Sequence, residues 1–252
     1  MKRFETFLQL HHAATPLLLG NCWDVSSAKL LEENGFKAIG TSSAALARSL
    51  GYEDGENLPF DLLLETVKRI QQNISVSLSV DMEKGYGTTN KTILENILKL
   101  YDMGVVGINI EDSRNKIMGP AAAFAETISS IANYLAQKNM AFFINARTDA
   151  FVVDLSNALQ ETVTRVKLYE GAGASGIFVP FIKNESDIKT ITATTTLPVN
   201  VLSTPGLPGI ATLTTLGVKR ISMGSSLFNA LKKEAVNKIK LILEQQSYDP
   251  LF

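Results

Sequence analysis

The residues best suited to chemistry are charged side chains that follow short apolar runs. Asp81 and Glu83 begin the segment Asp81-Met-Glu83-Lys-Gly-Tyr-Gly87, and Glu111 and Arg147 each follow a later apolar run. Carboxylates gathered without a cation repel one another, so the pKa of one is raised. Hard oxygen ligands suit Mg²⁺, with Mn²⁺ as a second candidate. Arg147 offers a planar donor fork for a carboxylate or phosphoryl group. These residues together predict an oxyacid site, where a metal could stabilise an enolate or a transferring oxyanion.

Each carboxylate also has a purely structural interpretation. Carboxylates at strand ends often cap the following helix or pair with a basic neighbour. Asp149 and Asp112 could be such partners, for Arg147 and Lys116 respectively, and Gly85-Tyr-Gly87 could be a flexible turn. The convergence of polar residues at several strand ends favours a functional site, whereas no single residue does.

Histidine, the commonest general base, is scarce in this chain. The only two histidines, His11 and His12, stand together near the N-terminus, before the first expected strand. Both are expected on the polar face of a short opening helix rather than as catalysts or ligands. Acid–base chemistry is therefore expected from a carboxylate, a lysine, a tyrosine or a metal-bound water.

A repeated pattern indicates the elements that position these residues. Four segments place an isoleucine four residues after a glycine, within a short β-rich run that follows helical spacing. A glycine that ends a helix in the left-handed conformation before a buried strand is the usual helix–strand junction. With four further runs, eight strands are expected, near residues 16–20, 35–39, 76–81, 104–108, 141–146, 173–177, 197–202 and 217–221.

Strands that alternate with helices pair in parallel through right-handed crossovers. Eight such units in 252 residues favour a single-domain (β/α)₈ TIM barrel over residues 1–252. An open doubly wound sheet is the competing fold, but residues 20–24 lack the glycine-rich phosphate turn that usually follows its first strand. Barrel enzymes place their chemistry at the C-terminal strand ends. Polar residues fall there in this chain, at residues 41–43, Asp81, Glu111, Arg147 and Asn200.

Composition and charge exclude several classes of partner. The formal net charge of −1 gives no reason to expect nucleic acid or an anionic membrane. No apolar run reaches the ~18 residues of a membrane span, and the N-terminus does not resemble a signal peptide. The single cysteine, Cys22, excludes an intramolecular disulfide and fits a reducing compartment. A cytoplasmic protein with a small-molecule oxyacid substrate is expected.

The segment at residues 81–87 resembles the phosphoenolpyruvate mutase/isocitrate lyase superfamily, whose usual motif is D-x-D-x-G-Y/F-G. Further matches occur in the order of that superfamily, over roughly residues 5–235. They are Thr41-Ser-Ser-Ala44, Leu50-Gly-Tyr-Glu-Asp54, Ile110-Glu-Asp112 and Asn145-Ala-Arg-Thr-Asp-Ala150. The later runs Gly176-Ile-Phe-Val-Pro180, Pro198-Val-Asn-Val201 and Pro205-Gly-Leu-Pro208 are similar to its phosphonomutase-like branch.

The resemblance implies a metal centre and an assembly. It implies Mg²⁺ near Asp81, Glu83 and Glu111, with Asp54 nearby. It also implies a homo-oligomer, a dimer or tetramer, in which the last helix is exchanged between protomers. Residues 227–243 carry an apolar stripe, which would cover its own sheet in an ordinary barrel and a neighbour's barrel after exchange.

The resemblance further implies how the substrate is held. Ser42, Ser43 and Ala44 would hold a substrate carboxylate through backbone N–H and hydroxyl donors, helped by Arg147. Asp54 and Asn200 are also assigned to the substrate site. A mobile loop at residues 113–120 would close over the substrate. Lys116 on that loop is assigned as catalytic, together with Arg147.

Three departures from the superfamily narrow the reaction. Glu83 replaces the second aspartate of the metal motif. The loop reads Lys116-Ile-Met-Gly-Pro120, where isocitrate and methylisocitrate lyases carry K-x-C-G-H, and the only cysteine is Cys22. The lyase glutamate expected after the sixth strand is replaced by Pro180-Phe181. Those two lyase activities are therefore not expected, and the loop also lacks the K-x-N segment of the true mutases.

Three functions remain open. The first is an Mg²⁺-dependent enzyme that cleaves or hydrolyses a C–C or P–C bond of a small 2-oxo or 2-hydroxy acid through an enolate-like intermediate. The second is a barrel that binds an oxyacid without turnover, as a sensor or scaffold. The third is a phosphate-gripping isomerase, because Ser203-Thr-Pro-Gly206 and Gly224-Ser-Ser226 resemble phosphate loops, although helix N-caps account for them equally.

Overall fold

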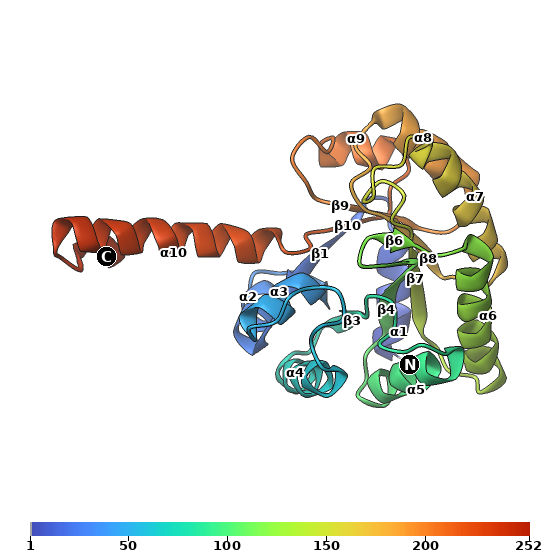
Figure 1. Cartoon of the computed structure of the whole chain (residues 1–252), viewed down its shortest axis with the longest axis horizontal. Helices are drawn as coiled ribbons and strands as arrows, with labels where there is room; N and C mark the ends of the chain where they lie inside the picture. The colour runs from blue at the N-terminus through green and yellow to red at the C-terminus, as the bar shows by residue number, and fades with distance from the viewer. Residues whose placement is uncertain (1) are drawn as a thin grey trace.

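A computed structural model describes residues 2–252 and contains a closed parallel β-barrel with helices around it (Figure 1). The barrel strands run in the order β1-β2-β3-β4-β7-β8-β9-β10, and β10 pairs with β1 to close the sheet. Their bounds are β1 Leu17–Cys22, β2 Ala38–Thr41, β3 Ser77–Asp81, β4 Gly107–Glu111, β7 Phe143–Arg147, β8 Gly176–Val179, β9 Val199–Leu202 and β10 Arg220–Ser222. The (β/α)₈ prediction is confirmed, and the open doubly wound sheet is excluded.

Helices alternate with the barrel strands and, apart from α10, pack against the barrel. Their bounds are α1 Lys2–His11, α2 Val25–Glu33, α3 Ser43–Ser49, α4 Phe60–Asn73, α5 Asn90–Asp102, α6 Ala121–Gln137, α7 Ala158–Gly171, α8 Glu185–Thr194, α9 Ile210–Thr215, α10 Ser226–Gln245 and the 3₁₀ helix η1 Asp249–Leu251. The helical spacing expected before β4 is present in α5, where Ile93 and Ile97 are buried against the sheet. Gly104 then ends this segment with a φ of 87°, as the junction pattern predicted.

The strand register decides which polar residues meet at the rim. Glu111 of β4 pairs with Arg147 of β7, and Arg147 pairs in turn with Phe178 of β8. Ile108 and Ile110, which alternate with the polar positions of β4, are buried in the main hydrophobic core. Residues of neighbouring strands therefore present their polar side chains at one end of the barrel.

The N-terminal helix α1 is packed into the fold through His11. This side chain is 1% exposed, stacks on Phe143 with ring centroids 4.5 Å apart, and its Nδ1 lies 2.8 Å from the carbonyl oxygen of Phe7. Burial, with Arg220 nearby, lowers the pKa of His11 to about 3. The expectation that His11 lies on a polar face is wrong, because its neutral ring completes an aromatic cluster. His12 is exposed, as expected.

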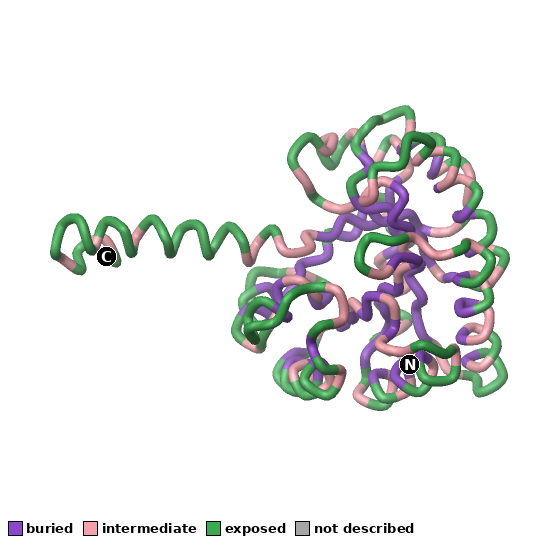
Figure 2. Tube along the Cα trace, in the orientation of Figure 1, coloured by how far each residue is buried: buried purple, intermediate pink, exposed green. Residues whose placement is uncertain are grey.

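The last helix, α10, projects away from the barrel (Figures 1 and 2). None of its 20 residues, all of which the structure describes, is buried. At its base Phe228 packs edge-on against Trp23, with ring centroids 5.1 Å apart. Coverage of its own sheet, the ordinary barrel arrangement, is therefore excluded, and Leu18 of β1 stays 42% exposed. Among the helices of residues 2–252, none has both the length and the apolar character needed to cross a bilayer.

Candidate active site

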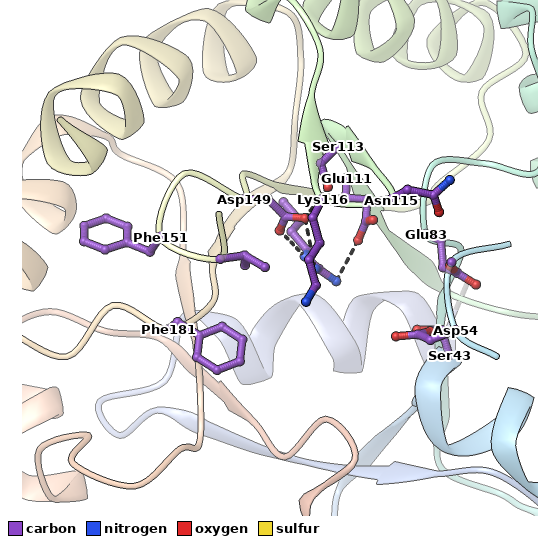
Figure 3. A pocket seen from close by; sticks show the side chains of 13 residues that line it. Ser43, Asp54, Glu83, Glu111, Ser113, Asn115, Lys116, Asp149, Phe151 and Phe181 are labelled. Carbon is purple, nitrogen blue, oxygen red and sulfur yellow. Dashed lines mark hydrogen bonds and ion pairs between the residues drawn. The ribbon is translucent and has the colours of Figure 1, made fainter. Parts of the chain in front are cut away.

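A cavity of about 520 Å³ opens at the C-terminal ends of the barrel strands (Figure 3). It is lined by Ser43, Asp54, Gly55, Glu83, Glu111, Ser113, Asn115, Lys116, Arg147, Asp149, Phe151, Val152 and Phe181. A smaller cavity of about 100 Å³ shares Ser43, Asp54 and Arg147 with it. The smaller cavity is also lined by Ser42, Ala44 and Asp81. The structure thus brings together every predicted site residue except Asn200.

Asp81 stands at the end of β3 with one oxygen engaged and one free. Its Oδ2 accepts a hydrogen bond from the hydroxyl of Ser43 at 2.8 Å, and its own backbone N–H donates to Oγ1 of Thr41 at 2.9 Å. Its Oδ1 is buried without a hydrogen-bond partner among the described residues. A buried, unpartnered carboxylate oxygen is costly unless a donor or a cation meets it.

Ser42 and Ala44 flank Ser43 at the start of α3. The Ser42 hydroxyl accepts from the backbone N–H of Ala45 at 3.3 Å and so caps the helix. The backbone N–H of Ala44 has no hydrogen-bond partner within residues 2–252. Of the donors expected from this segment, the Ala44 amide and the O–H of Ser42, which is so far used only as an acceptor, are therefore still available to a ligand.

Glu83 occupies the second acidic position in a left-handed backbone conformation, with a φ of 49°. Its carboxylate accepts from the backbone N–H of Glu56 at 2.6 Å and from the Tyr86 hydroxyl at 2.9 Å. Burial, together with the negative charges of Asp81 and Asp54, raises the pKa of Glu83 to about 7. Burial and Asp81 also raise the pKa of Asp54.

The glycines around Tyr86 form a packed turn. Gly85 has a φ of 104°, and a Cβ there would lie 2.8 Å from the Ile93 side chain. The backbone N–H of Tyr86 donates to Glu56 at 2.6 Å, and Glu56 is paired with Arg114 at 2.6 Å. These contacts tie the turn to two neighbouring loops, which is typical of an ordered turn.

Arg147 is shared by two carboxylates. Its Nη1 lies 2.7 Å from Oε2 of Glu111, and its Nε and Nη2 donate to Asp149 at 2.6 and 3.1 Å. Burial raises the pKa of Glu111 well above its usual range even though Arg147 opposes that rise. Burial disfavours the charge of Arg147, but Glu111 and Asp149 outweigh it and raise the Arg147 pKa. The pairing proposed for Asp149 is confirmed.

Asp112 does not pair with Lys116, so that part of the structural interpretation is wrong. Its carboxylate accepts from Nη1 of Arg165 at 2.9 Å, from the Tyr169 hydroxyl at 2.7 Å and from the backbone N–H of Asp149 at 3.0 Å. Arg165 also donates to the carbonyl oxygen of Gly119 at 2.9 Å. Asp112 therefore holds α7 and the loop after β7 in place at the end of the barrel. The Lys116 side chain is left pointing into the cavity.

Lys116 lies at the tip of a small hairpin formed by β5 Ser113–Arg114 and β6 Ile117–Met118. Asn115 and Lys116 both have positive φ, 50° and 61°, as the two central residues of a type I′ turn require. The Lys116 side chain points into the cavity between its acidic side and Phe181 (Figure 3). No salt bridge engages it within residues 2–252. The sequence predicted a mobile loop here, but not this hairpin.

Asn200 lies below the cavities, inside the barrel. It is 1% exposed, and its Nδ2 donates to the Ser222 hydroxyl at 3.1 Å. It lines neither cavity, so its assignment to the substrate site gains no support. Phe151, Val152 and Phe181, which line one side of the larger cavity, were not predicted from the sequence. The position of Phe181 directly after a strand end was the available signal.

Two backbone amides at the start of the loop around residues 224–226 are already engaged by a side chain. The backbone N–H groups of Met223 and Gly224 donate to Oδ1 of Asn21 at 2.8 and 3.0 Å. Phosphate loops depend on such amides pointing at the ligand. This arrangement weighs against the isomerase alternative.

The acidic side of the cavity fits a hydrated divalent cation better than a fully ligated one. No group of three or more His, Cys, Asp and Glu residues within residues 2–252 could hold a metal ion by itself. Asp81 offers a free oxygen, whereas Glu83 and Glu111 are already engaged by protein donors. Mg²⁺ keeps several waters and needs only one or two carboxylates, so these residues fit that ion.

Comparison with known proteins decides the family. The family model of phosphoenolpyruvate phosphomutase matches residues 7–243. The chain belongs to the phosphoenolpyruvate phosphomutase family. A protein of this family from Burkholderia cenocepacia, provisionally described as a phosphonomutase, has a similar structure, with a TM-score of 0.90 and 32% identity over 95% of this chain and 100% of that one. The resemblance proposed from the motifs is confirmed.

Two sequence relatives show the range of this family. An uncharacterized protein of Mycobacterium tuberculosis is 35% identical over 226 residues, 89% of this chain and 84% of that protein. The oxaloacetate decarboxylase of Paraburkholderia xenovorans is 28% identical and spans 89% of this chain and 77% of its own. Phosphonopyruvate hydrolase, solved with oxalate and Mg²⁺, shares the fold with a TM-score of 0.86 at 21% identity, covering 99% of this chain and 89% of its own. A phosphomutase and a decarboxylase therefore occur among the sequence relatives of this chain, and a hydrolase among the proteins that share its fold.

Proposed function

We propose that this chain is an Mg²⁺-dependent lyase that breaks a C–C or P–C bond of a small 2-oxo or 2-hydroxy acid through an enolate-like intermediate. The observation that carries the proposal is the set of carboxylates around the two adjoining cavities, namely Asp54, Asp81, Glu83 and Glu111. Burial, together with the negative charges of Asp81 and Asp54, raises the pKa of Glu83 to about 7, and a bound cation would relieve the repulsion between these charges.

The acidic residues differ in how they would hold the ion. Asp81, with its free Oδ1, would hold the ion, and Glu83 and Glu111, whose carboxylates already accept from protein donors, would stabilise its hydration shell. When bound, Mg²⁺ or Mn²⁺ supplies positive charge that stabilises negative charge on the substrate oxygens. The Ala44 amide binds the substrate carboxylate, helped by Ser43 on the same turn.

Lys116 and Arg147 divide the remaining work. Lys116 is the general acid or base, because it is the unpaired cationic group over the cavity and reaches it from a surface hairpin. Arg147 orients the substrate indirectly, since its donors hold Glu111 and Asp149 in place. The hairpin of β5 and β6 covers the cavity and limits the access of water.

Turnover of a substrate panel tests the proposal. Oxaloacetate, alkylated malates and phosphonopyruvate are supplied with and without Mg²⁺ or Mn²⁺. We expect product only when the metal is present. The Asp81→Asn variant should be inactive with or without the metal, and the kcat of Lys116→Met should be lower by roughly 10²-fold or more. Asp61→Asn, at an exposed position of α4, is the matched control. Absence of turnover together with absence of metal-dependent oxalate binding contradicts the proposal.

The second candidate function is an oxyacid-binding barrel without turnover. It is favoured by the contacts that all three guanidinium nitrogens of Arg147 make with Glu111 and Asp149, and by Pro180-Phe181 in place of the lyase glutamate. Calorimetry separates it from the first. Tight oxalate binding with Mg²⁺, and no product from any acid of the panel, supports the binding function.

A further inference from the structure

The larger cavity has two chemically different sides (Figure 3). Ser43, Asp54 and Glu83 lie on one side, and Phe181 lies on the other with its ring turned towards the cavity, with Lys116 between them. Phe151 lies on the side of Phe181, but its ring points away from the cavity. Val152 belongs to the same lining as these two residues. An oxyacid whose carboxylate lies near Ser43 and Ala44 therefore extends its far end towards an apolar wall.

Phe181 is held in this wall by an unusual backbone conformation. It follows Pro180 just after β8 and has a φ of 63°, which is a genuine outlier for a bulky residue. The next side chain, Ile182, is 1% exposed, whereas Phe181 remains 46% exposed. The turn thus buries Ile182 in the core and presents the Phe181 ring to the cavity. Core packing does not account for a strained, half-exposed aromatic, and strain of this kind concentrates at ligand sites.

The apolar wall itself carries no cation, and Lys116 is the one free cation beside it among the described residues that line the cavity. Among the described residues that line the larger cavity, only Lys116 and Arg147 are positively charged. All three guanidinium nitrogens of Arg147 are engaged by Glu111 and Asp149. Lys116 sits at the tip of the hairpin, between the two sides. A second carboxylate or phosphonate against Val152 and Phe181 would lose its hydration and would have only Lys116 as a partner, the residue that the proposed function assigns to proton transfer.

We propose that Phe181 and Val152 form a subsite for an uncharged, branched alkyl or aryl group at the far end of the oxyacid. The preferred substrate class is then a monocarboxylic 4-hydroxy-2-oxo acid with an apolar tail, rather than a di-acid. Its C3–C4 bond breaks to give the enolate of pyruvate and an aldehyde that carries the tail, and the proton of the 4-hydroxyl group goes to Lys116 as general base. This inference rests on the proposed function, because it takes the carboxylate end of the ligand to lie at Ser43 and Ala44. A hydrophobic pocket discriminates by about tenfold or more per methylene group.

A matched pair of ligands tests the subsite without relying on turnover. Malate and 2-hydroxy-4-methylpentanoate have the same skeleton, except that the distal carboxylate of malate is replaced by an isopropyl group of similar shape. Calorimetry with Mg²⁺ is expected to give at least about tenfold tighter binding of the isopropyl compound to the native protein. Oxalate, which has no tail, is the reference ligand.

Variants of Phe181 test whether its ring is what recognises the apolar tail. Phe181→Ala is expected to remove most of the preference and leave oxalate affinity unchanged, Phe181→Leu to retain part of it, and Phe181→Arg to favour malate. Ile210→Ala, at a position 51% exposed and outside the lining of either cavity, is the control.

The outcomes distinguish this inference from the proposed function. Oxalate binding with Mg²⁺ but tighter binding of malate to the native protein overturns the apolar subsite and leaves the proposed function intact. An equal loss of all three ligands in Phe181→Ala also overturns it, since the ring would then only exclude water. Failure of oxalate itself to bind with Mg²⁺ overturns the proposed function and the subsite together.

Discussion

Glu83 keeps an acidic residue at the second position of the metal motif but changes where its carboxylate lies. Its side chain is one methylene longer than the aspartate usual at this position, and its backbone is left-handed. Both carboxylate oxygens are engaged, by Glu56 and Tyr86, whereas Asp81 keeps one oxygen free. The longer side chain therefore places the Glu83 carboxylate in the hydrogen-bond network around the cavity, so that Asp81 is the better candidate for a direct metal ligand.

Glu83 is expected to make the metal-free protein less stable at alkaline pH. Its pKa is raised to about 7 in the folded state, so its stabilising contribution is complete below the unfolded value near 4.5 and is lost as the pH rises through about 7. The loss is at most about 1.4 kcal/mol per pH unit. Urea unfolding between pH 5 and pH 8 should show a weaker pH dependence in Glu83→Gln. Glu95→Gln, on the exposed face of α5, is the control, and identical pH dependence in all three proteins contradicts the prediction.

The Arg165–Asp112 pair offers a second residue-scale prediction. The two side chains are 6% and 0% exposed, so Arg165→Met leaves a buried charge without its partner. Such a change typically costs about 3–5 kcal/mol in the free energy of unfolding. The matched control is Arg69→Met, whose pair with Glu65 is 68% and 53% exposed and contributes less than about 1 kcal/mol. If urea unfolding showed equal losses of stability in Arg165→Met and Arg69→Met, the buried charge of Asp112 would not need Arg165 as its partner.

At the scale of elements, prediction from sequence succeeded where the signal was local. The glycine–isoleucine pattern located strands because both parts of the signal lie within a few residues. The left-handed helix end requires the glycine, and the buried strand requires the apolar residues that follow it. Lys116 was assigned to a loop correctly, but its hairpin depends on two positive-φ residues without glycine. Asp112 was given a partner near in sequence, whereas Arg165 lies 53 residues further along. The role of His11 was missed because α1 docks on Phe143, a contact that helical spacing does not encode.

The docking of α1 should be sensitive to acid through His11. Its folded-state pKa of about 3 lies below the usual 6.5, so the neutral ring stabilises the fold above pH 6.5, and this contribution is lost as the pH falls towards 3. His11→Phe keeps an aromatic ring against Phe143 and cannot be protonated. Between pH 7 and pH 4.5 the native protein is expected to lose about 2–3 kcal/mol more stability than this variant. His12→Phe, at the exposed neighbouring position, should behave like the native protein in the same unfolding series.

At the scale of the whole molecule, the barrel and α10 each expose an apolar surface that the other kind of element would normally cover. A helix of 20 residues is about 30 Å long, and an amphipathic helix of this kind is normally stabilised by burial of its apolar face. Leu231, Val236, Ile239 and Leu243 are 41–65% exposed. The outer face of β1, where Leu18 is exposed, lacks the helix that would cover it in a self-contained barrel. Because Phe228 and Trp23 fix the base of α10, the helix cannot simply fold back without breaking that contact.

We propose that α10 packs on a second copy of the chain, so that the protein is a homodimer or a tetramer of such dimers. Full burial of each large apolar side chain contributes about 1.5–3 kcal/mol, so two buried charges should dissociate the assembly. The double variant Leu231→Glu with Ile239→Glu is expected to be monomeric in size-exclusion chromatography with light scattering, and its circular dichroism should remain that of the folded barrel. Asn237→Glu, an exposed polar position of the same helix, should leave the oligomer intact. A native protein that is monomeric at micromolar concentration, or a double variant that stays oligomeric, contradicts the exchange of α10.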